Sequence, residues 1–401
     1  MSLEIYNLVS SIHDGKNIDV TLRKFVTSIE EELGDRFVNV PLENIRACDC
    51  PLIFIKSGGV EGEFKKIYKK FHEPYLLLTS GMHNSLAASM EILSFLKQNN
   101  LKGEILHGDI AGVAKRIKTF KAAITAKKRI NGKRFGVMGR PSDWLISSKV
   151  DYANARKTLG VVLLDLPLDE VLSEIQLHNN VKNSYTEALL GKGFDKAEIQ
   201  KALSIYSALK SIVGKYNLSG LTIRCFDLLS SLKSTGCAAV SILNSEGIVC
   251  GCEGDVPALL SMVILHELSG EPVFMANPSR INTRDNEVVF AHCTLPLCMA
   301  DSYALDTHFE SGIGVGIKGL IREGPATIFK LSSSLKEHFV SSGKILENLN
   351  ERNLCRTQIR LKLDADVSCF LKNPLGNHHL ICKGSYAGAV AEFLNLLPPA
   401  K

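Results

Sequence analysis

Apolar and polar residues alternate in two ways along the chain, and the pattern changes near Glu271. Before that point, short continuous apolar runs such as residues 51–56 and 74–79 are followed by stretches with apolar residues at helical spacing. One such stretch predicts a long helix over residues 110–128. Continuous apolar strands separated by amphipathic helices indicate parallel sheets that are covered on both faces.

A second alternating unit begins near Arg134 and again places helical stretches between apolar runs. Its predicted strands cover residues 135–138, 159–165, 221–225 and 247–253. The chain is therefore expected to be an α/β protein with two doubly wound parallel-sheet domains, an N-terminal domain over residues 1–133 and a second domain over residues 134–268.

Beyond Glu271 the strands are short and are not separated by long helices. Residues 358–364 alternate strictly, with apolar residues at every second position and polar or charged residues between them. A period of two with one polar face is typical of antiparallel sheet. We therefore expect a C-terminal antiparallel β-barrel-like domain over residues 269–401, with a terminal helix near residues 389–397.

Composition narrows the class of protein. The 401 residues are 45% hydrophobic and 22% charged, as in ordinary globular proteins, and no apolar stretch approaches the length of a membrane span. The net charge of +5 is too small to indicate a nucleic-acid partner. Eleven scattered cysteines and no visible secretory signal favour a reduced, cytoplasmic setting.

Candidate chemistry begins at Glu253, which directly follows an apolar strand. Ligands of open parallel sheets bind beyond the carboxyl ends of the strands, although a surface loop carboxylate is the alternative. His292 ends a strand, and the pair His378 and His379 precedes another. One carboxylate with two imidazoles suits Mn²⁺, Co²⁺ or Fe²⁺ better than a closed structural zinc site.

Other motifs are less informative. Cys48 and Cys50, like Cys250 and Cys252, are one residue too close for the usual zinc knuckle. The glycine-rich residues 312–316 lack the preceding buried strand and the following helix of a phosphate loop. We interpret them as a strand or bend where backbones pack closely.

Several short motifs resemble the L-fucose/L-arabinose isomerase superfamily. They occur in that family's order at residues 251–255, 274–278, 291–293, 308–310, 312–319, 325–328 and 376–384, with weaker similarity at 79–84 and 136–144. The resemblance implies two α/β domains, a C-terminal β domain and an active site between the second and third domains. It also implies a homo-oligomer, a trimer or hexamer, because a neighbouring subunit often covers that site.

The resemblance further implies a Mn²⁺-dependent enzyme that interconverts aldoses and ketoses through an enediol. Glu253 matches a metal-binding carboxylate that also acts as acid and base. His379 matches the C-terminal metal histidine, with His378 less favoured as ligand and kept as a substrate-binding candidate. His292 matches a ligand of the arabinose branch, and Asn277 stands where the family has a second metal-binding, catalytic carboxylate.

Asn277 leaves two main hypotheses open. An amide oxygen can coordinate a metal but cannot move a proton, so Glu253 would have to act alone or with another group such as Asp255. The first hypothesis is a metal-dependent isomerase of a small sugar. The second is a sugar-binding or regulatory homologue with impaired catalysis. A periplasmic-type binding module is disfavoured by the β domain and the lack of a signal peptide.

Further candidates for sugar contacts lie in loops. His83 and Asn84 follow a strand and could reach a sugar, although Asn84 could equally cap a helix. Trp144 could stack on a sugar face, but a buried packing role is favoured. Arg280 could bind an acidic substrate or pair with Asp285.

Overall fold

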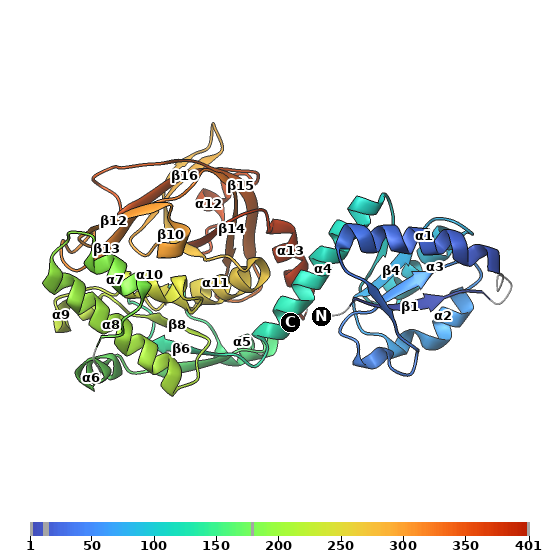
Figure 1. The fold of residues 1–401 in the computed structure, drawn as a ribbon, viewed down its shortest axis with the longest axis horizontal. Helices are drawn as coiled ribbons and strands as arrows, with labels where there is room; N and C mark the ends of the chain where they lie inside the picture. The colour runs from blue at the N-terminus through green and yellow to red at the C-terminus, as the bar shows by residue number, and fades with distance from the viewer. Residues whose placement is uncertain (1–2, 11–15, 178–179, 399–401) are drawn as a thin grey trace. The chain divides into compact units, whose positions relative to one another are not determined.

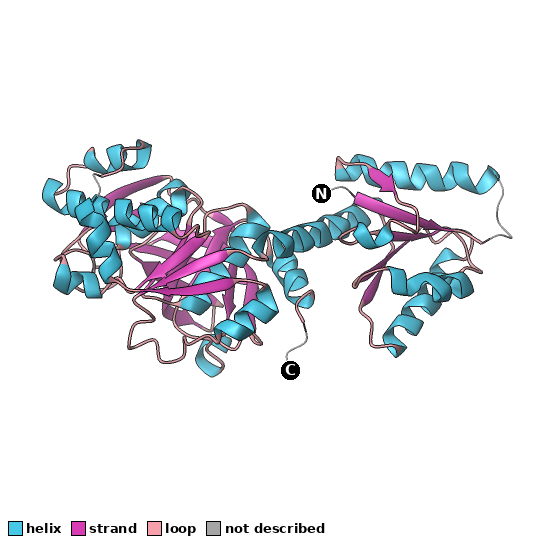
Figure 2. Ribbon diagram, turned by 90° about the horizontal axis from the view of Figure 1, so that it is seen from below, coloured by secondary structure: helices cyan, strands magenta, loops and turns pink. Residues whose placement is uncertain are grey.

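The computed structural model describes residues 3–10, 16–177 and 180–398. It divides into two compact units, residues 1–125 and residues 126–401. The first unit holds one parallel sheet, whereas the second holds another parallel sheet and a closed β-barrel (Figures 1 and 2). The predicted fold class, two parallel-sheet α/β parts followed by an antiparallel barrel, is confirmed.

The sheet of the first unit has the order β2-β1-β3-β4-β5, and all its strands are parallel. Its strands are β1 (Leu3–Leu8), β2 (Phe37–Asn39), β3 (Leu52–Ile55), β4 (Tyr75–Thr79) and β5 (Gly103–Leu106). Its helices are α1 (Lys16–Leu33), α2 (Glu61–Ile67), α3 (Ser85–Gln98) and α4 (Ile110–Ile130). Apolar side chains of α1 and α4 cover one face, and those of α2 and α3 cover the other.

The parallel sheet of the second unit has the order β7-β6-β8-β9. Its strands are β6 (Arg134–Met138), β7 (Val162–Leu166), β8 (Gly220–Ile223) and β9 (Val249–Cys252). The accompanying helices are α5 (Tyr152–Leu159), α6 (Asp169–Leu177), α7 (Ser184–Leu190), α8 (Lys196–Lys215), α9 (Asp227–Ser231), α10 (Cys237–Ser245) and α11 (Val256–Ser269). Asp195 caps α8, because its carboxylate accepts the N–H groups of Ala197 and Glu198.

Six antiparallel strands close the barrel in the order β10-β11-β16-β15-β14-β17. They are β10 (Phe274–Asn282), β11 (Glu287–His292), β14 (Gly324–Leu331), β15 (His338–Asn348), β16 (Thr357–Leu363) and β17 (His379–Lys383). Smaller elements are the hairpin β12 (Ser302–Asp306) and β13 (Gly316–Leu320), with α12 (Cys369–Lys372) and α13 (Ala387–Asn395). The alternating residues 358–364 form most of β16, as predicted.

Helix α11 joins the second parallel sheet to the barrel. It is buried almost all round and packs against β9 on the sheet and against β14 and β17 on the barrel. A helix that is apolar on every side must be covered on every side, so sheet and barrel share one core. The second unit therefore contains both predicted domains 134–268 and 269–401, whose boundary stays a prediction.

Two smaller expectations can be compared with the fold. Gly314 packs against another loop, since a Cβ there would lie 2.6 Å from Thr235 Oγ1, which agrees with close backbone packing in residues 312–316. All eleven cysteines are free thiols.

Within residues 3–10, 16–177 and 180–398, no helix has both the length and the apolar character needed to cross a membrane.

Candidate functional site

The loops that follow β6, β8 and β9 meet at the carboxyl edge of the second parallel sheet. The Ser142 N–H donates to the carbonyl oxygen of Glu253 at 2.9 Å, and the Gly254 N–H donates to that of Ile223 at 3.0 Å. Gly254 has a positive φ of 72°, and a Cβ there would collide with the Arg140 carbonyl. Glycine is thus required for the loops to close around Glu253.

Glu253 itself adopts a left-handed backbone conformation with φ of 61°. For a residue other than glycine, this conformation costs about 1 kcal/mol or more. The residue is only 7% exposed, and its Oε2 accepts the indole N–H of Trp144 at 2.7 Å. Its Oε1 lies 3.4 Å from Nε2 of His378. The unusual backbone therefore directs the carboxylate into the protein.

Glu253, His292 and His378 form a buried cluster in which one potential ligand atom from each lies within 4.8 Å of the others. His292 is the last residue of β11, and His378 immediately precedes β17. The two rings lie edge to face with centroids 5.5 Å apart. Nδ1 of His292 contacts Thr294 Oγ1 at 2.7 Å, which leaves Nε2 available to the cluster.

Asn277 lies on β10, the strand between β11 and β17. Two residues earlier, Met275 accepts the backbone N–H of Cys252, so this face of β10 is directed toward β9 and its loop. Asn277 Oδ1 is buried and has no hydrogen-bond partner among the described residues, and the buried His378 Nε2 makes no hydrogen bond there beyond its 3.4 Å ionic contact with Glu253. Buried polar atoms without partners fit a site completed by a metal ion.

His379 lies outside the cluster of Glu253, His292 and His378, although the sequence favours it over His378 as a ligand; which histidine binds a metal stays a prediction. Its ring packs among Phe290, Phe339 and Phe370, with the shortest centroid separation, 4.7 Å, to Phe370. Adjacent residues of an extended chain point to opposite faces, so only one of the two histidines can face Glu253. The pairing of β17 within the barrel places His378, and not His379, on the side of Glu253.

Behind His378 lies a second buried layer of charge. His378 Nδ1 is 2.9 Å from Asp255 Oδ2, and Nζ of Lys330 lies 3.5 Å from the same oxygen. All three side chains are fully buried. Burial alone would raise the pKa of Asp255, but the Lys330 charge and the His378 contact hold that pKa well below its ordinary value. Asp255 also caps α11 by accepting the Ala258 N–H at 2.8 Å.

The protonation states of the cluster follow from burial and from these contacts. Burial alone would raise the pKa of Glu253, but the adjacent His378 and the Trp144 N–H lower it to about 2. Burial alone would lower the pKa of His378, yet Asp255 and Glu253 raise it to about 9. Burial lowers the pKa of His292 to about 3. Near neutral pH the metal-free cluster therefore holds an ionised carboxylate, one imidazolium and one neutral imidazole.

Trp144 is not a buried packing residue, so that expectation is wrong. Its side chain is 51% exposed, and it meets Phe226 edge to face at 4.8 Å between ring centroids. Its loop is anchored by Arg224, whose two terminal nitrogens bind the Asp143 carboxylate at 3.0 and 2.7 Å. The indole is thus fixed beside Glu253 with part of its surface open to solvent.

The other candidates for sugar contacts are Arg280, His83 and Asn84. Arg280 pairs with Glu351, and Asp285 instead accepts a hydrogen bond from Asn282. His83 and Asn84 follow β4 in the first unit, both with positive φ. Asn84 occupies the N-cap position of α3, but its side chain makes no capping hydrogen bond. A role of these residues in sugar binding stays a prediction.

Sequence reasoning overlooked Lys330, Phe226 and His308. His308 is 7% exposed, and its ring packs edge to face on Phe226 at 5.3 Å. The signal for Lys330 was its place between Phe329 and Leu331 in an otherwise apolar strand. A lysine in such a run is either at a strand end or buried beside a carboxylate.

The fold and the cluster together define a candidate divalent-metal site. A carboxylate and two imidazoles from three strand ends offer oxygen and nitrogen donors in a buried setting, a donor set consistent with a divalent cation.

Comparison with curated proteins finds sugar isomerases. The chain is 24% identical over 306 residues to the sulfoquinovose isomerase of Alkalicoccus urumqiensis, a match that covers 70% of this chain and 66% of that protein. It is 23% identical over 338 residues to the sulfoquinovose isomerase of Priestia aryabhattai, a match that covers 77% of this chain and 73% of that protein. The chain thus spans about two thirds to three quarters of these relatives. No protein-family model matches it.

Proposed function

We propose that this protein is a metal-dependent aldose–ketose isomerase that acts on a small sugar through an enediol. The observation that carries the proposal is the buried cluster of Glu253, His292 and His378 at the carboxyl edge of the second sheet. The similarity to curated sulfoquinovose isomerases supports the same class of reaction.

A divalent cation, Mn²⁺ in our proposal, would be held by Glu253, His292, His378 and the Asn277 amide oxygen. When bound, it would polarise the sugar carbonyl and so make the neighbouring C–H proton more acidic. The Asp255 carboxylate holds Nδ1 of His378, so that Nε2 faces Glu253. Such an outer carboxylate fixes the orientation of a ligating imidazole.

Proton transfer between C2 and C1 of the sugar is assigned to Glu253. Its carboxylate is ionised at neutral pH, and the Trp144 N–H fixes one of its oxygens. Asn277 cannot carry a proton, and Asp255 is fully buried against His378 and Lys330. The geometry therefore favours Glu253 acting alone over a substitute role for Asp255.

Substrate and assembly are also part of the proposal. The relatives' names make sulfoquinovose a necessary member of any substrate panel, beside pentoses, 6-deoxyhexoses and hexoses. We expect a trimer or hexamer, as the family resemblance implies. A sugar-binding homologue without catalysis is less favoured, because the site keeps both the ionised carboxylate and the imidazoles.

The test is exchange of solvent deuterium into C1 and C2 of that sugar panel, followed by NMR with Mn²⁺ present. Glu253→Gln should abolish exchange, whereas the matched surface variant Glu63→Gln should retain it, since Glu63 is exposed on α2. Full exchange in Glu253→Gln would refute the assignment. No exchange with any sugar, while Mn²⁺ binds, would favour the binding-protein alternative.

A further inference from the structure

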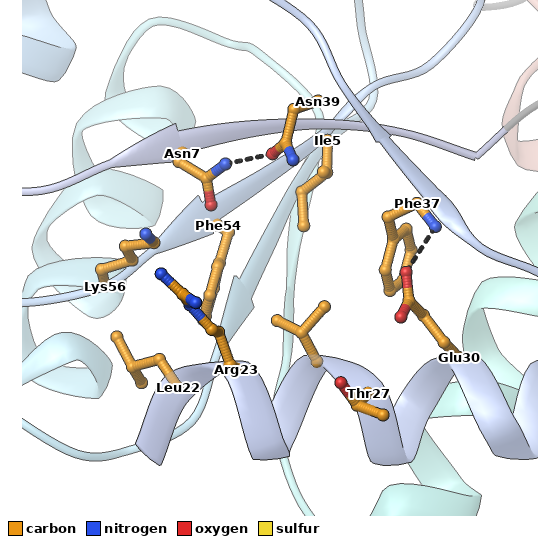
Figure 3. Close-up of a pocket in the computed structure, with 11 residues that line it drawn as sticks. Ile5, Asn7, Leu22, Arg23, Thr27, Glu30, Phe37, Asn39, Phe54 and Lys56 are labelled. Atoms are coloured by element: carbon orange, nitrogen blue, oxygen red, sulfur yellow. Dashed lines mark hydrogen bonds between the residues drawn. The ribbon is translucent and has the colours of Figure 1, made fainter. Parts of the chain in front are cut away.

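The first unit contains a pocket that is lined by residues of that unit. It has a volume of about 350 Å³ and lies between α1 and the strands β2, β1 and β3 (Figure 3). Its floor is apolar, with Ile5 and Phe54 from the sheet and Leu22 from the helix. Its polar groups come from different elements and face the same space.

Three neighbouring strands change from apolar to polar on the face beneath α1. In β1 the apolar Ile5 is followed two residues later by Asn7, and in β2 Phe37 is followed by Asn39. Lys56 follows Phe54 in the same way, directly after β3. Because side chains two apart share a face, these polar groups line one carboxyl edge of the sheet.

Helix α1 adds a second cation from the opposite side. Arg23 and Thr27 are four residues apart, so they lie on one stripe of the helix and both line the pocket. Figure 3 shows Arg23 and Lys56 at the same end of the pocket as Asn7, whereas Glu30 lies at the other end beside Phe37. Glu30 is engaged there by the Phe37 backbone N–H at 2.8 Å.

The amides add directional groups. Asn7 donates its side-chain N–H to Oδ1 of Asn39, which fixes both amides (Figure 3). The Asn39 Nδ2 group then remains to donate, and the Asn7 Oδ1 atom remains to accept a ligand hydroxyl. A guanidinium, an ammonium and an amide N–H around one space form the donor set that recognises tetrahedral oxyanions.

The position of the pocket in the sheet also favours ligand binding. With the order β2-β1-β3-β4-β5, the chain leaves β1 toward one edge and continues through β3 toward the other. Ligands of open parallel sheets bind beside the carboxyl ends of the strands at this reversal. The pocket is lined by β1 and β3, the two strands that flank it.

From these observations we propose that the pocket binds a small polyhydroxylated metabolite through a phosphate or sulfonate group. Arg23 and Lys56 hold the oxyanion, and the amides of Asn7 and Asn39 contact hydroxyls next to it. The volume exceeds that of inorganic phosphate alone and accommodates a sugar-sized body on the apolar floor.

Calorimetric titration of the full chain tests the proposal, with ribose 5-phosphate, ethanesulfonate, inorganic phosphate and neutral ribose as probes. Saturable binding of an oxyanion should weaken about tenfold or more in Arg23→Gln and in Lys56→Gln. The control Lys24→Gln removes the same charge from an exposed neighbouring position on α1 that does not line the pocket, and it should leave binding within about twofold.

The probes separate the two oxyanions, since tighter binding of ribose 5-phosphate than of ethanesulfonate would identify phosphate, and the reverse would identify sulfonate. Equal weakening in all three variants would mean non-specific attraction and would overturn the proposal. Binding of ribose as tightly as ribose 5-phosphate, or no saturable binding of any probe, would also overturn it. Circular dichroism of each variant checks that the unit is folded.

Discussion

Binding of Mn²⁺ to the metal-free protein should release one proton, and His378 should be its source. A ligating imidazole nitrogen must give up its proton. The pKa of Glu253 is lowered to about 2 and that of His292 to about 3, so neither carries a proton to lose at neutral pH. His378, with its pKa raised to about 9, does carry one.

The size of the effect follows from that pKa. Near pH 7 the solution is about two pH units below it, so displacement of the proton opposes metal binding by about 2.7 kcal/mol, or about 100-fold in affinity. The apparent affinity should rise about tenfold per pH unit between about pH 6 and about pH 8, because the competing proton becomes scarcer. The proton on Nδ1 of His378 remains there, hydrogen-bonded to the Asp255 carboxylate. The proton that leaves is therefore the one on Nε2.

Calorimetry with MnCl₂ in buffers of different ionisation enthalpy counts the released protons directly. His378→Gln should bind Mn²⁺ more weakly and release no proton, whereas the exposed His72→Gln should behave as the unaltered protein does. Mn²⁺ binding without proton release, or with an affinity that does not change with pH, would refute the assignment of His378.

Three further variants test the surroundings of the site. Lys330→Met should lower the free energy of unfolding in urea by about 3 kcal/mol, because Asp255 keeps a buried charge without its cation; an unchanged value would contradict this. Gly254→Ala should weaken Mn²⁺ binding about tenfold or more, because the added Cβ displaces the loop that holds Glu253. An unchanged affinity in calorimetry would show that the loop tolerates the added Cβ and would contradict this. Trp144→Phe keeps the ring but removes the hydrogen bond to Glu253, so isomerisation should slow by about tenfold while the melting temperature stays within a few degrees.

Local patterns were enough to predict many of the helices and strands. The strict alternation of residues 358–364 and the helical spacing of residues 110–128 depend on one element at a time, and both were found as β16 and α4. Glu253 and His292 are ligand candidates because each stands at the end of an apolar run, and the structure brings both into one buried cluster.

The features that the sequence did not decide depend on contacts between distant segments. His378 and His379 are adjacent residues of the same type, so the sequence does not distinguish them. The pairing of β17 with β10 and β14 decides which one faces Glu253. The place of Trp144 depends on its hydrogen bond to Glu253, which lies 109 residues further along the chain. Burial of Lys330 likewise requires knowing that Asp255 lies opposite.

The backbone of Glu253 has a consequence for how this chain can evolve. Its left-handed conformation is one that glycine adopts without strain, so selection for folding alone would favour glycine at this position. A glutamate persists there against that preference, with its charge buried as well. A change to glycine would therefore relieve the backbone and remove a buried charge at the loss of the carboxylate, and this trade constrains substitution at position 253.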